Sequence, residues 1–309
     1  MKMKDKIKPF DVSILSTYMG RSLTLVVTVA VVGITVSAYL SSGGPQRGTI
    51  NVCVPAGTSA VSAMRKYEPL RAVLSRETRR PAELVACDDT WPAGCDLYVM
   101  PVHTYLRHGE PLGIAAIYEV VSGDEKQNDA VLVARASDAE IDFARLDPGE
   151  IAFAGPSSIN GFWVQMLSLS RRGFVPPEDA GVLRFEGPDP HGLRVVLGVL
   201  YGAYRLGACT QADLSVMTEV GVVRPGELEI VQRDEALPEI VVAAPQRDTD
   251  YYLSELRKIE GLLEKADGSV SADAPVGLLN VYGVGGLRPL DPARLEKARQ
   301  LFELYGNLF

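Results

Sequence analysis

The sequence predicts an α/β fold built from two units, and three features of the chain support this prediction. Short apolar runs of strand length alternate with longer segments of helical spacing over most of the 309 residues. Glycine and proline, with 29 and 20 copies, interrupt this pattern where turns are needed. A strand–turn–helix segment at residues 151–173 opens a second run of the same alternation after a polar stretch. A chain of this length forms one large or two ordinary domains with a full core.

The first unit begins with an apolar strand at residues 49–55, which a Pro-Ala-Gly turn ends. Thr58 or Ser59 then caps a helix whose apolar residues share one face. Because strands and helices alternate, we expect a largely parallel sheet. The further strands of this run are expected at residues 83–87, 96–100, 113–120 and 130–134.

The second unit begins with a strand at residues 151–154, which Gly155 and Pro156 end. A strongly β-prone run at residues 238–243 is placed to return the chain to the first unit. The other elements expected after residue 154 are strands at 182–185, 206–209 and 228–231, and helices at 162–172, 192–201, 251–265 and 292–304.

The turn before the helix at residues 162–172 carries Ser157, Ser158 and Asn160, which are residue types that favour helix N-caps. A helix start leaves backbone N–H groups unpaired at the positive end of the helix dipole, which suits a small anion. Two interpretations therefore remain open: the serines only cap the helix, or the turn binds an anion. The same two interpretations apply to Ser59.

The net charge of −8 makes nucleic acid a poor partner for this chain, and the charge is unevenly placed. Residues 1–44 carry a net charge of +3 and the rest carries −11. Residues 23–40 hold no charged side chain and are long enough to span a bilayer. We expect a cytoplasmic tail at residues 1–22, a transmembrane signal anchor at 23–40 and a linker at 41–48, with the body outside the cytoplasm. A signal peptide cut near residues 36–38 is the alternative.

If the body of the protein is outside the cytoplasm, its four cysteines are possible partners in disulfides. Cys87 and Cys95 flank a turn-rich segment, so their pairing closes a short loop. Cys53 and Cys209 are expected to be buried thiols. Three histidines and no close Cys/His cluster disfavour a metal site, and no motif predicts a cofactor.

Several motifs in order resemble the periplasmic binding proteins of the phosphate/phosphite/phosphonate (PhnD-like) class, which serve ABC transporters. The resemblance covers about residues 49–305. It rests on five segments, which are Tyr67-Glu-Pro-Leu70, Gly94-Cys-Asp-Leu-Tyr-Val-Met-Pro101 followed by Tyr105, Ile151-Ala-Phe followed by Ser158-Ile-Asn-Gly-Phe162, Phe185-Glu-Gly, and Gly286-Leu-Arg-Pro-Leu-Asp291.

The resemblance implies a type II periplasmic-binding-protein fold with a ligand held between two lobes. Lobe 1 would comprise residues 49–136 and 239–309, and lobe 2 residues 137–238. The family's anion loop falls on Ser158, Ile159, Asn160 and Gly161, where Ile159 and Asn160 replace hydroxyl residues of the family pattern.

At the other cleft positions that the resemblance implies, either the residue type differs from the family pattern or two interpretations remain open. Asp189 stands where a histidine is expected, and Arg205 replaces an acid. An inward Arg205 would pair with an anion and repel an ammonium group, whereas an outward one would be a lost contact. Tyr105 either lines the cleft or packs beneath the sheet.

The resemblance implies a solute receptor that binds a small oxyanion and delivers it to an ABC permease at the extracytoplasmic face of the inner membrane. The alternative is a sensing or scaffold domain of the same fold that has lost transport and works with a membrane signalling partner. Because no set of nucleophile, base and orienting residue converges in the sequence, we do not expect an enzyme.

Overall fold

The computed structural model describes residues 48–56, 60–87, 90–121, 128–138, 140–186, 192–259 and 286–306. The chain divides into two compact units, Met1–Gly48 and Thr49–Phe309, and the helices and strands of the described residues all belong to the second unit. In the described part of the chain no helix has the length and apolar character needed to cross a bilayer. The predicted tail and anchor at residues 1–40 lie outside that part.

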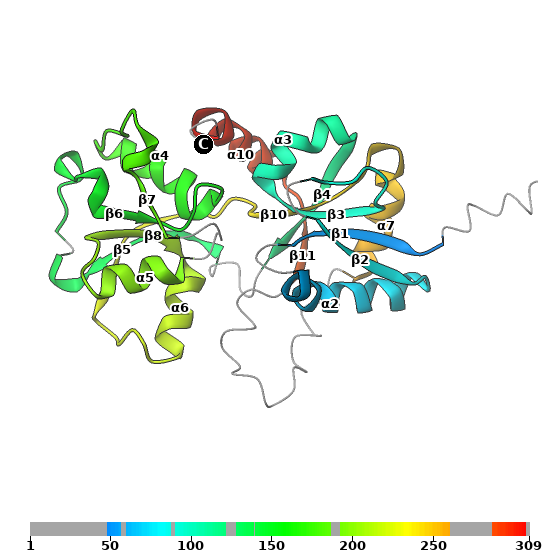
Figure 1. The fold of residues 1–309 in the computed structure, drawn as a ribbon, viewed down its shortest axis with the longest axis horizontal. Helices are drawn as coiled ribbons and strands as arrows, with labels where there is room; N and C mark the ends of the chain where they lie inside the picture. The colour runs from blue at the N-terminus through cyan, green and yellow to red at the C-terminus, as the bar shows by residue number, and fades with distance from the viewer. Residues whose placement is uncertain are drawn as a thin grey trace, which may run out of the picture. The chain divides into compact units, whose positions relative to one another are not determined.

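The first sheet has six strands in the order β11-β4-β10-β3-β1-β2 (Figure 1). β1 pairs in parallel with β2 and β3, whereas β10 runs antiparallel to both β3 and β4, and β11 antiparallel to β4. The strands are β1 (Ile50–Pro55), β2 (Ala82–Cys87), β3 (Leu97–Pro101), β4 (Ile114–Val121), β10 (Ile240–Pro245) and β11 (Gly286–Pro289).

Helices cover both faces of the first sheet. α2 (Ala60–Thr78) and α7 (Thr249–Ile259) pack on one face, where their buried residues join one apolar cluster with Val52 and Val54 of β1. α3 (Val102–Leu112) and α10 (Pro292–Tyr305) belong to the cluster on the other face, which Cys53 of the same strand joins. This alternation along β1 is the period-two pattern of a strand buried on both sides.

The second sheet has five strands in the order β7-β6-β8-β5-β9. α5 (Leu193–Leu200) and α6 (Gln211–Glu219) pack on one face and α4 (Val164–Arg171) on the other. The strands are β5 (Ala130–Arg135), β6 (Ile151–Phe153), β7 (Arg184–Phe185), β8 (Leu206–Thr210) and β9 (Leu228–Asp234). Short helical turns lie at Ala136–Asp138, Phe143–Arg145, Pro148–Glu150, Ile159–Trp163, Ala180–Val182 and Gln246–Asp248.

The strand directions correct the expectation of a largely parallel sheet, since both sheets are mixed. β5 (Ala130–Arg135) pairs with β8 and β9, so this strand belongs to the second sheet, although the division implied by the resemblance assigned it to lobe 1. The chain leaves the first sheet after β4 and returns through residues 235–239, which we call the crossover segment. β10, the strand that follows the crossover segment, therefore runs antiparallel to the parallel core of the first sheet.

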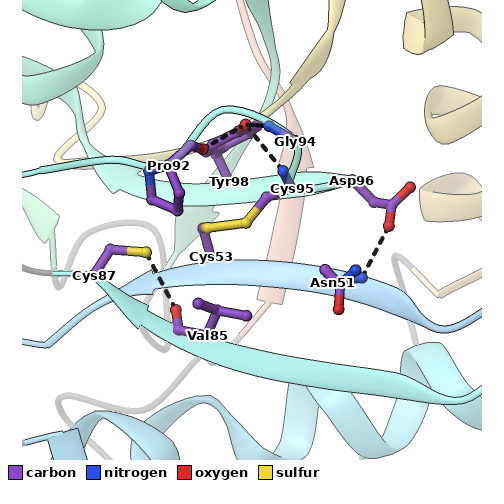
Figure 2. Close-up of a disulfide and its surroundings, with 9 residues drawn as sticks. All are labelled: Asn51, Cys53, Val85, Cys87, Pro92, Gly94, Cys95, Asp96 and Tyr98. Carbon is purple, nitrogen blue, oxygen red and sulfur yellow. Dashed lines mark hydrogen bonds between the residues drawn. A yellow bond between two sulfur atoms is a disulfide. The ribbon is translucent and has the colours of Figure 1, made fainter.

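The disulfide joins Cys53 to Cys95, with an S–S distance of 2.01 Å, and the predicted pairing of Cys87 with Cys95 is wrong (Figure 2). Cys53 lies on β1 and Cys95 lies just before its parallel neighbour β3, which brings the two Cα atoms to 6.0 Å. Sequence proximity had favoured Cys87, but β2 carries this residue to the outer side of β1. Cys87 is a buried thiol that donates to the Val85 carbonyl oxygen at 3.4 Å, and Cys209 is buried as expected.

Candidate functional site

The turn after β6 is capped by its own serine. The N–H of Gly161 donates to Ser158 Oγ at 2.9 Å, and the π-helical turn Ile159–Trp163 leads directly into α4. A Cβ atom at Gly161 would lie 2.6 Å from Ala154 Cβ, so the tight turn requires glycine here. Residues 158–161, which we call the anion loop, are all buried. The capping interpretation of Ser158 therefore holds, whatever else the loop binds.

A carboxylate of the chain itself occupies the anion loop. The N–H of Ile159 donates to Glu239 Oε1 at 3.2 Å, and the N–H of Asn160 donates to Glu239 Oε2 at 3.2 Å. Asn160 Nδ2 donates to the same Oε2 at 3.1 Å, and the Ser158 hydroxyl adds a further hydrogen bond. Backbone N–H groups at a helix start thus hold an oxyanion, as their partial positive charge predicts. That oxyanion is the side chain of a residue about 80 positions later.

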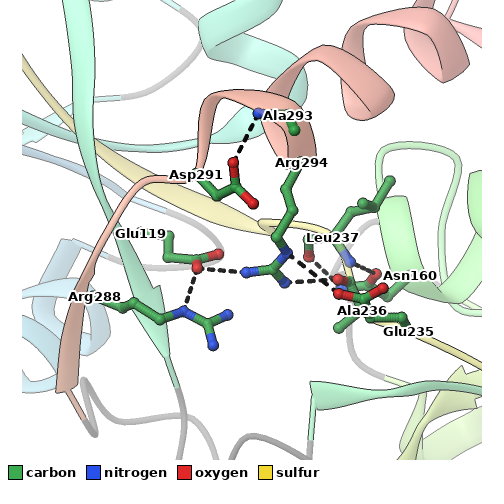
Figure 3. A network of polar contacts seen from close by, with 9 residues as sticks. All are labelled: Glu119, Asn160, Glu235, Ala236, Leu237, Arg288, Asp291, Ala293 and Arg294. Atoms are coloured by element: carbon green, nitrogen blue, oxygen red, sulfur yellow. Dashed lines mark hydrogen bonds and ion pairs between the residues drawn. The ribbon is translucent and has the colours of Figure 1, made fainter.

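The side chain of Asn160 is directed at the crossover segment. Its Oδ1 accepts from the N–H of Leu237 at 2.8 Å, and its Nδ2 donates to the Leu237 carbonyl oxygen at 2.9 Å (Figure 3). Both groups of the Leu237 backbone are thereby satisfied in a buried position. An asparagine amide supplies the donor and the acceptor that this contact needs, which a serine hydroxyl of the family pattern would not supply in the same geometry.

Glu239 keeps its carboxyl group enclosed although the residue as a whole is only half-buried. Burial raises the pKa of Glu239 to about 7, against the lowering effect of the hydrogen bonds from Asn160, Ser158 and Ile159. The nearby carboxylate of Asp213, at the start of α6, also contributes to this raised pKa of Glu239. The loop donors therefore do not compensate fully for the loss of hydration of the ionised form.

The first sheet contributes the start of α3 to the same region. The N–H of Val102 donates to the Glu239 carbonyl oxygen at 2.9 Å, and the next residue, His103, hydrogen-bonds the backbone of Ser157. Burial, together with the charges of Arg107 and His108, lowers the pKa of His103 to about 4. His103 is therefore neutral at physiological pH. Elements of both sheets thus meet at the crossover segment.

A buried ion cluster holds the crossover segment from the other side. Glu119 Oε1 on β4 receives Arg288 Nε of β11 at 2.5 Å and Arg294 Nη1 of α10 at 2.6 Å (Figure 3). Arg294 Nη2 donates to the Ala236 carbonyl oxygen at 2.6 Å. Contacts to Ala236, Leu237 and Glu239 therefore fix successive parts of the crossover segment.

Two of the other predicted ligand residues, Tyr105 and Arg205, make their contacts away from the anion loop. The N–H of Ala116 on β4 donates to the Tyr105 hydroxyl at 3.2 Å, so that side chain packs against the first sheet. Arg205 precedes β8 and its N–H donates to the Glu150 carbonyl oxygen before β6. Because β6 and β8 are parallel, Arg205 lies at the edge opposite the anion loop, which corrects its placement in the cleft. Ser59 and Asp189 lie outside the described residues.

Glu239 is the residue that sequence reasoning missed. The available signal was an acid directly after Pro238, at the start of the β-prone run that returns the chain to the first sheet. Nothing in the spacing indicates that this acid turns toward a loop 80 residues earlier. In the part of the chain that the structure describes, no group of three or more metal-ligating residues is close enough to hold an ion.

A family model described as the periplasmic substrate-binding protein of phosphonate ABC transporters matches residues 95–295. This match spans more than half of the chain. No curated protein matches.

Solved structures with the same fold are similar at low sequence identity. PhnD1 from Prochlorococcus marinus in complex with methylphosphonate has a TM-score of 0.58 and 11% identity, and the match covers 84% of this chain and 99% of that one. A Xanthomonas citri protein bound to ATP has a TM-score of 0.59, 16% identity and coverage of 84% and 98%. A phosphonate-transporter binding component from Pseudomonas aeruginosa has a TM-score of 0.54, 13% identity and coverage of 84% and 87%. At these identities the likeness shows the two-sheet fold alone.

Proposed function

The chain belongs to the family of periplasmic substrate-binding proteins of phosphonate ABC transporters, and we propose that it binds a small phosphonate-like or phosphate-like oxyanion at the anion loop. The carboxylate of Glu239 supports this proposal, because it places an oxyanion on the loop's backbone donors. We propose further that residues 49–129 with 240–309 form lobe 1 and residues 130–234 lobe 2, joined by the crossover segment.

We also propose that residues 23–40 tether the protein to the inner membrane, with the two lobes on the periplasmic side and an ABC permease as the partner. Fractionation of cells that express the full chain tests the tether. We expect the protein in the membrane fraction, with the mass of the uncleaved chain. A mature protein that begins near residue 39 and is released with the soluble periplasmic fraction would instead support a cleaved signal peptide.

Thermal unfolding of the full-length chain tests oxyanion binding, with millimolar methylphosphonate, inorganic phosphate or sulfate added at pH 6. A ligand at 100 times its Kd adds about 2.7 kcal/mol, which raises Tm by about 5–10 °C for a domain of this size. Ser158→Ala removes a loop hydroxyl and is expected to reduce the shift. Arg205→Ala, at the opposite edge of the sheet, is the matched control and should keep the shift.

A sensing or scaffold domain of the same fold is the second candidate function. The observation that favours it is again Glu239, which satisfies the loop without any added ligand. The contacts that hold Ala236 and Leu237 favour it too, because they fix the segment between the two sheets. If no oxyanion changes Tm at any pH, this candidate replaces the first, and the partner would be a membrane signalling protein rather than a permease.

A further inference from the structure

We propose that Glu239 is a built-in competitor for the anion loop, so that a free oxyanion binds at residues 158–161 only after this carboxylate has left. The inference rests on the proposed oxyanion function and concerns the regulation of that same site. It is carried by the two backbone N–H groups, of Ile159 and Asn160, that the carboxylate occupies at 3.2 Å each.

The loop donors serve one anion at a time. A backbone N–H makes one strong hydrogen bond, and the two that point at Glu239 take one carboxylate oxygen each. A second anion on the same donors would also lie within a few ångströms of the Glu239 charge in a buried site, where like charges repel strongly. Binding of a free oxyanion therefore requires Glu239 to rotate away or to take up a proton.

Departure of the carboxylate leaves the crossover segment in place. The Glu239 backbone is held by the N–H of Val102, and Leu237, two residues earlier, is held by the Asn160 amide. None of these contacts involves the Glu239 carboxyl group. A change of the side-chain torsions of Glu239 is thus sufficient to free the loop donors, without movement of the strand.

The surrounding charges favour the release. From the anion loop the carboxylate meets only neutral groups, which are N–H groups, an amide and a hydroxyl. From α6 the charged group is Asp213, which disfavours the ionised form. On α3 the residue that follows Val102 is His103, which is neutral because its pKa is lowered to about 4, mainly by burial. Protonation of Glu239, whose pKa is raised to about 7, removes the competing charge within the physiological pH range.

Calorimetric titration of the full-length chain with sulfate and with methylphosphonate, at pH 6 and pH 8.5, tests the inference. The charge of sulfate does not change over this range, whereas phosphoryl groups titrate near pH 6–7. If only the protonated carboxyl group permits binding, the competent fraction falls about 30-fold between these pH values, and the apparent sulfate affinity of the wild type falls with it. Glu239→Gln should bind sulfate about 30-fold more tightly than wild type at pH 8.5, with little pH dependence.

Two further variants make the result specific. Glu239→Ala removes the competing group altogether and should show the same sulfate affinity as Glu239→Gln. It also keeps the test available if Glu239→Gln folds poorly. Glu235→Gln changes an exposed acid of the same crossover segment and should leave the affinity and its pH dependence as in wild type. Equal sulfate affinity and equal pH dependence for wild type and Glu239→Gln would overturn the inference while leaving oxyanion binding intact.

A measurement without added anion separates failure of the inference from failure of the proposed function. Amide resonances of Ile159 and Asn160 should titrate together near pH 7 in wild type and stay constant in Glu239→Gln, since their N–H groups face the carboxylate. If neither protein binds an anion but these amides titrate, oxyanion binding is refuted and occupation of the loop is confirmed. If the amides do not titrate, the inference is refuted.

Discussion

Replacing Asn160 by alanine is expected to destabilise the protein far more than loss of a typical surface amide. The side chain makes three hydrogen bonds, two to the Leu237 backbone and one to Glu239. In Asn160→Ala the N–H and the carbonyl group of Leu237 stay buried and lose their partners. An unsatisfied buried polar group costs about 1–3 kcal/mol, so the two together predict a loss of about 2–6 kcal/mol. For a domain of this size, that loss lowers Tm by about 4–24 °C.

Urea unfolding and thermal unfolding of the purified variant measure this loss. Gln246→Ala removes an exposed amide directly after β10 and serves as the control, with an expected change within about 0.5 kcal/mol. Asn160→Asp keeps the acceptor for the Leu237 N–H but removes both donated bonds and adds a charge beside Glu239, so it should be no more stable than the alanine variant. A stability of Asn160→Ala within about 1 kcal/mol of wild type would refute the hydrogen bonds that join Asn160 of the anion loop to Leu237 of the crossover segment.

Three other substitutions test separate parts of the structure. Loss of the disulfide through Cys53→Ala with Cys95→Ala should cost about 4 kcal/mol of stability, since the bridge closes a separation of 42 residues. Unfolded wild-type protein should show two reactive thiols before reduction and four after it. Four reactive thiols before reduction would contradict the bridge. Gly161→Ala should cost about 1–3 kcal/mol, because the added Cβ meets another Cβ atom at 2.6 Å, and an unchanged Tm would show that the turn relaxes. Between the ordinary pKa of 4.5 and the folded pKa of about 7, folded Glu239 retains a proton that the unfolded chain releases. The free energy of unfolding of the wild type should therefore fall by about 1–3 kcal/mol as pH rises through this window. Glu239→Gln should lack this part of the decline, and parallel pH profiles of the two proteins would count against the raised pKa.

The fold was predictable from the sequence because its signals are local. Periodic apolar runs and Gly/Pro turns placed β1, β6, β8 and β10 within a few residues of their observed bounds. The position of β5 was not predictable in this way, because an apolar strand carries no mark of the sheet it joins. It pairs with β8 and β9, which lie 70 or more residues further along the chain.

The candidate site was predictable only in part, because some of its contacts join residues that are far apart in the sequence. Ser158 and Gly161 act within one turn, so capping preferences and the glycine indicated their roles. Cys53 pairs with Cys95 because two strands are neighbours in the sheet, and spacing along the chain pointed to Cys87 instead. Glu239 reaches the anion loop across about 80 residues, and a proline–acid pair before a strand is typical of many surface turns.

The contacts of the crossover segment bear on how a ligand would exchange. Hinge bending between lobes needs a few residues that can change their backbone torsions freely. Here Arg294 holds the carbonyl group of Ala236, the Asn160 amide holds both backbone groups of Leu237, and Val102 holds the carbonyl group of Glu239. The Glu239 carboxyl group is the part of this segment whose release breaks none of these backbone contacts.

We therefore expect oxyanion binding to exchange one anion for another with little change in the separation of the two sheets. Small-angle scattering of the full-length protein with and without saturating sulfate at pH 6 should give the same radius of gyration, and a clear decrease on binding would show that the crossover segment bends after all.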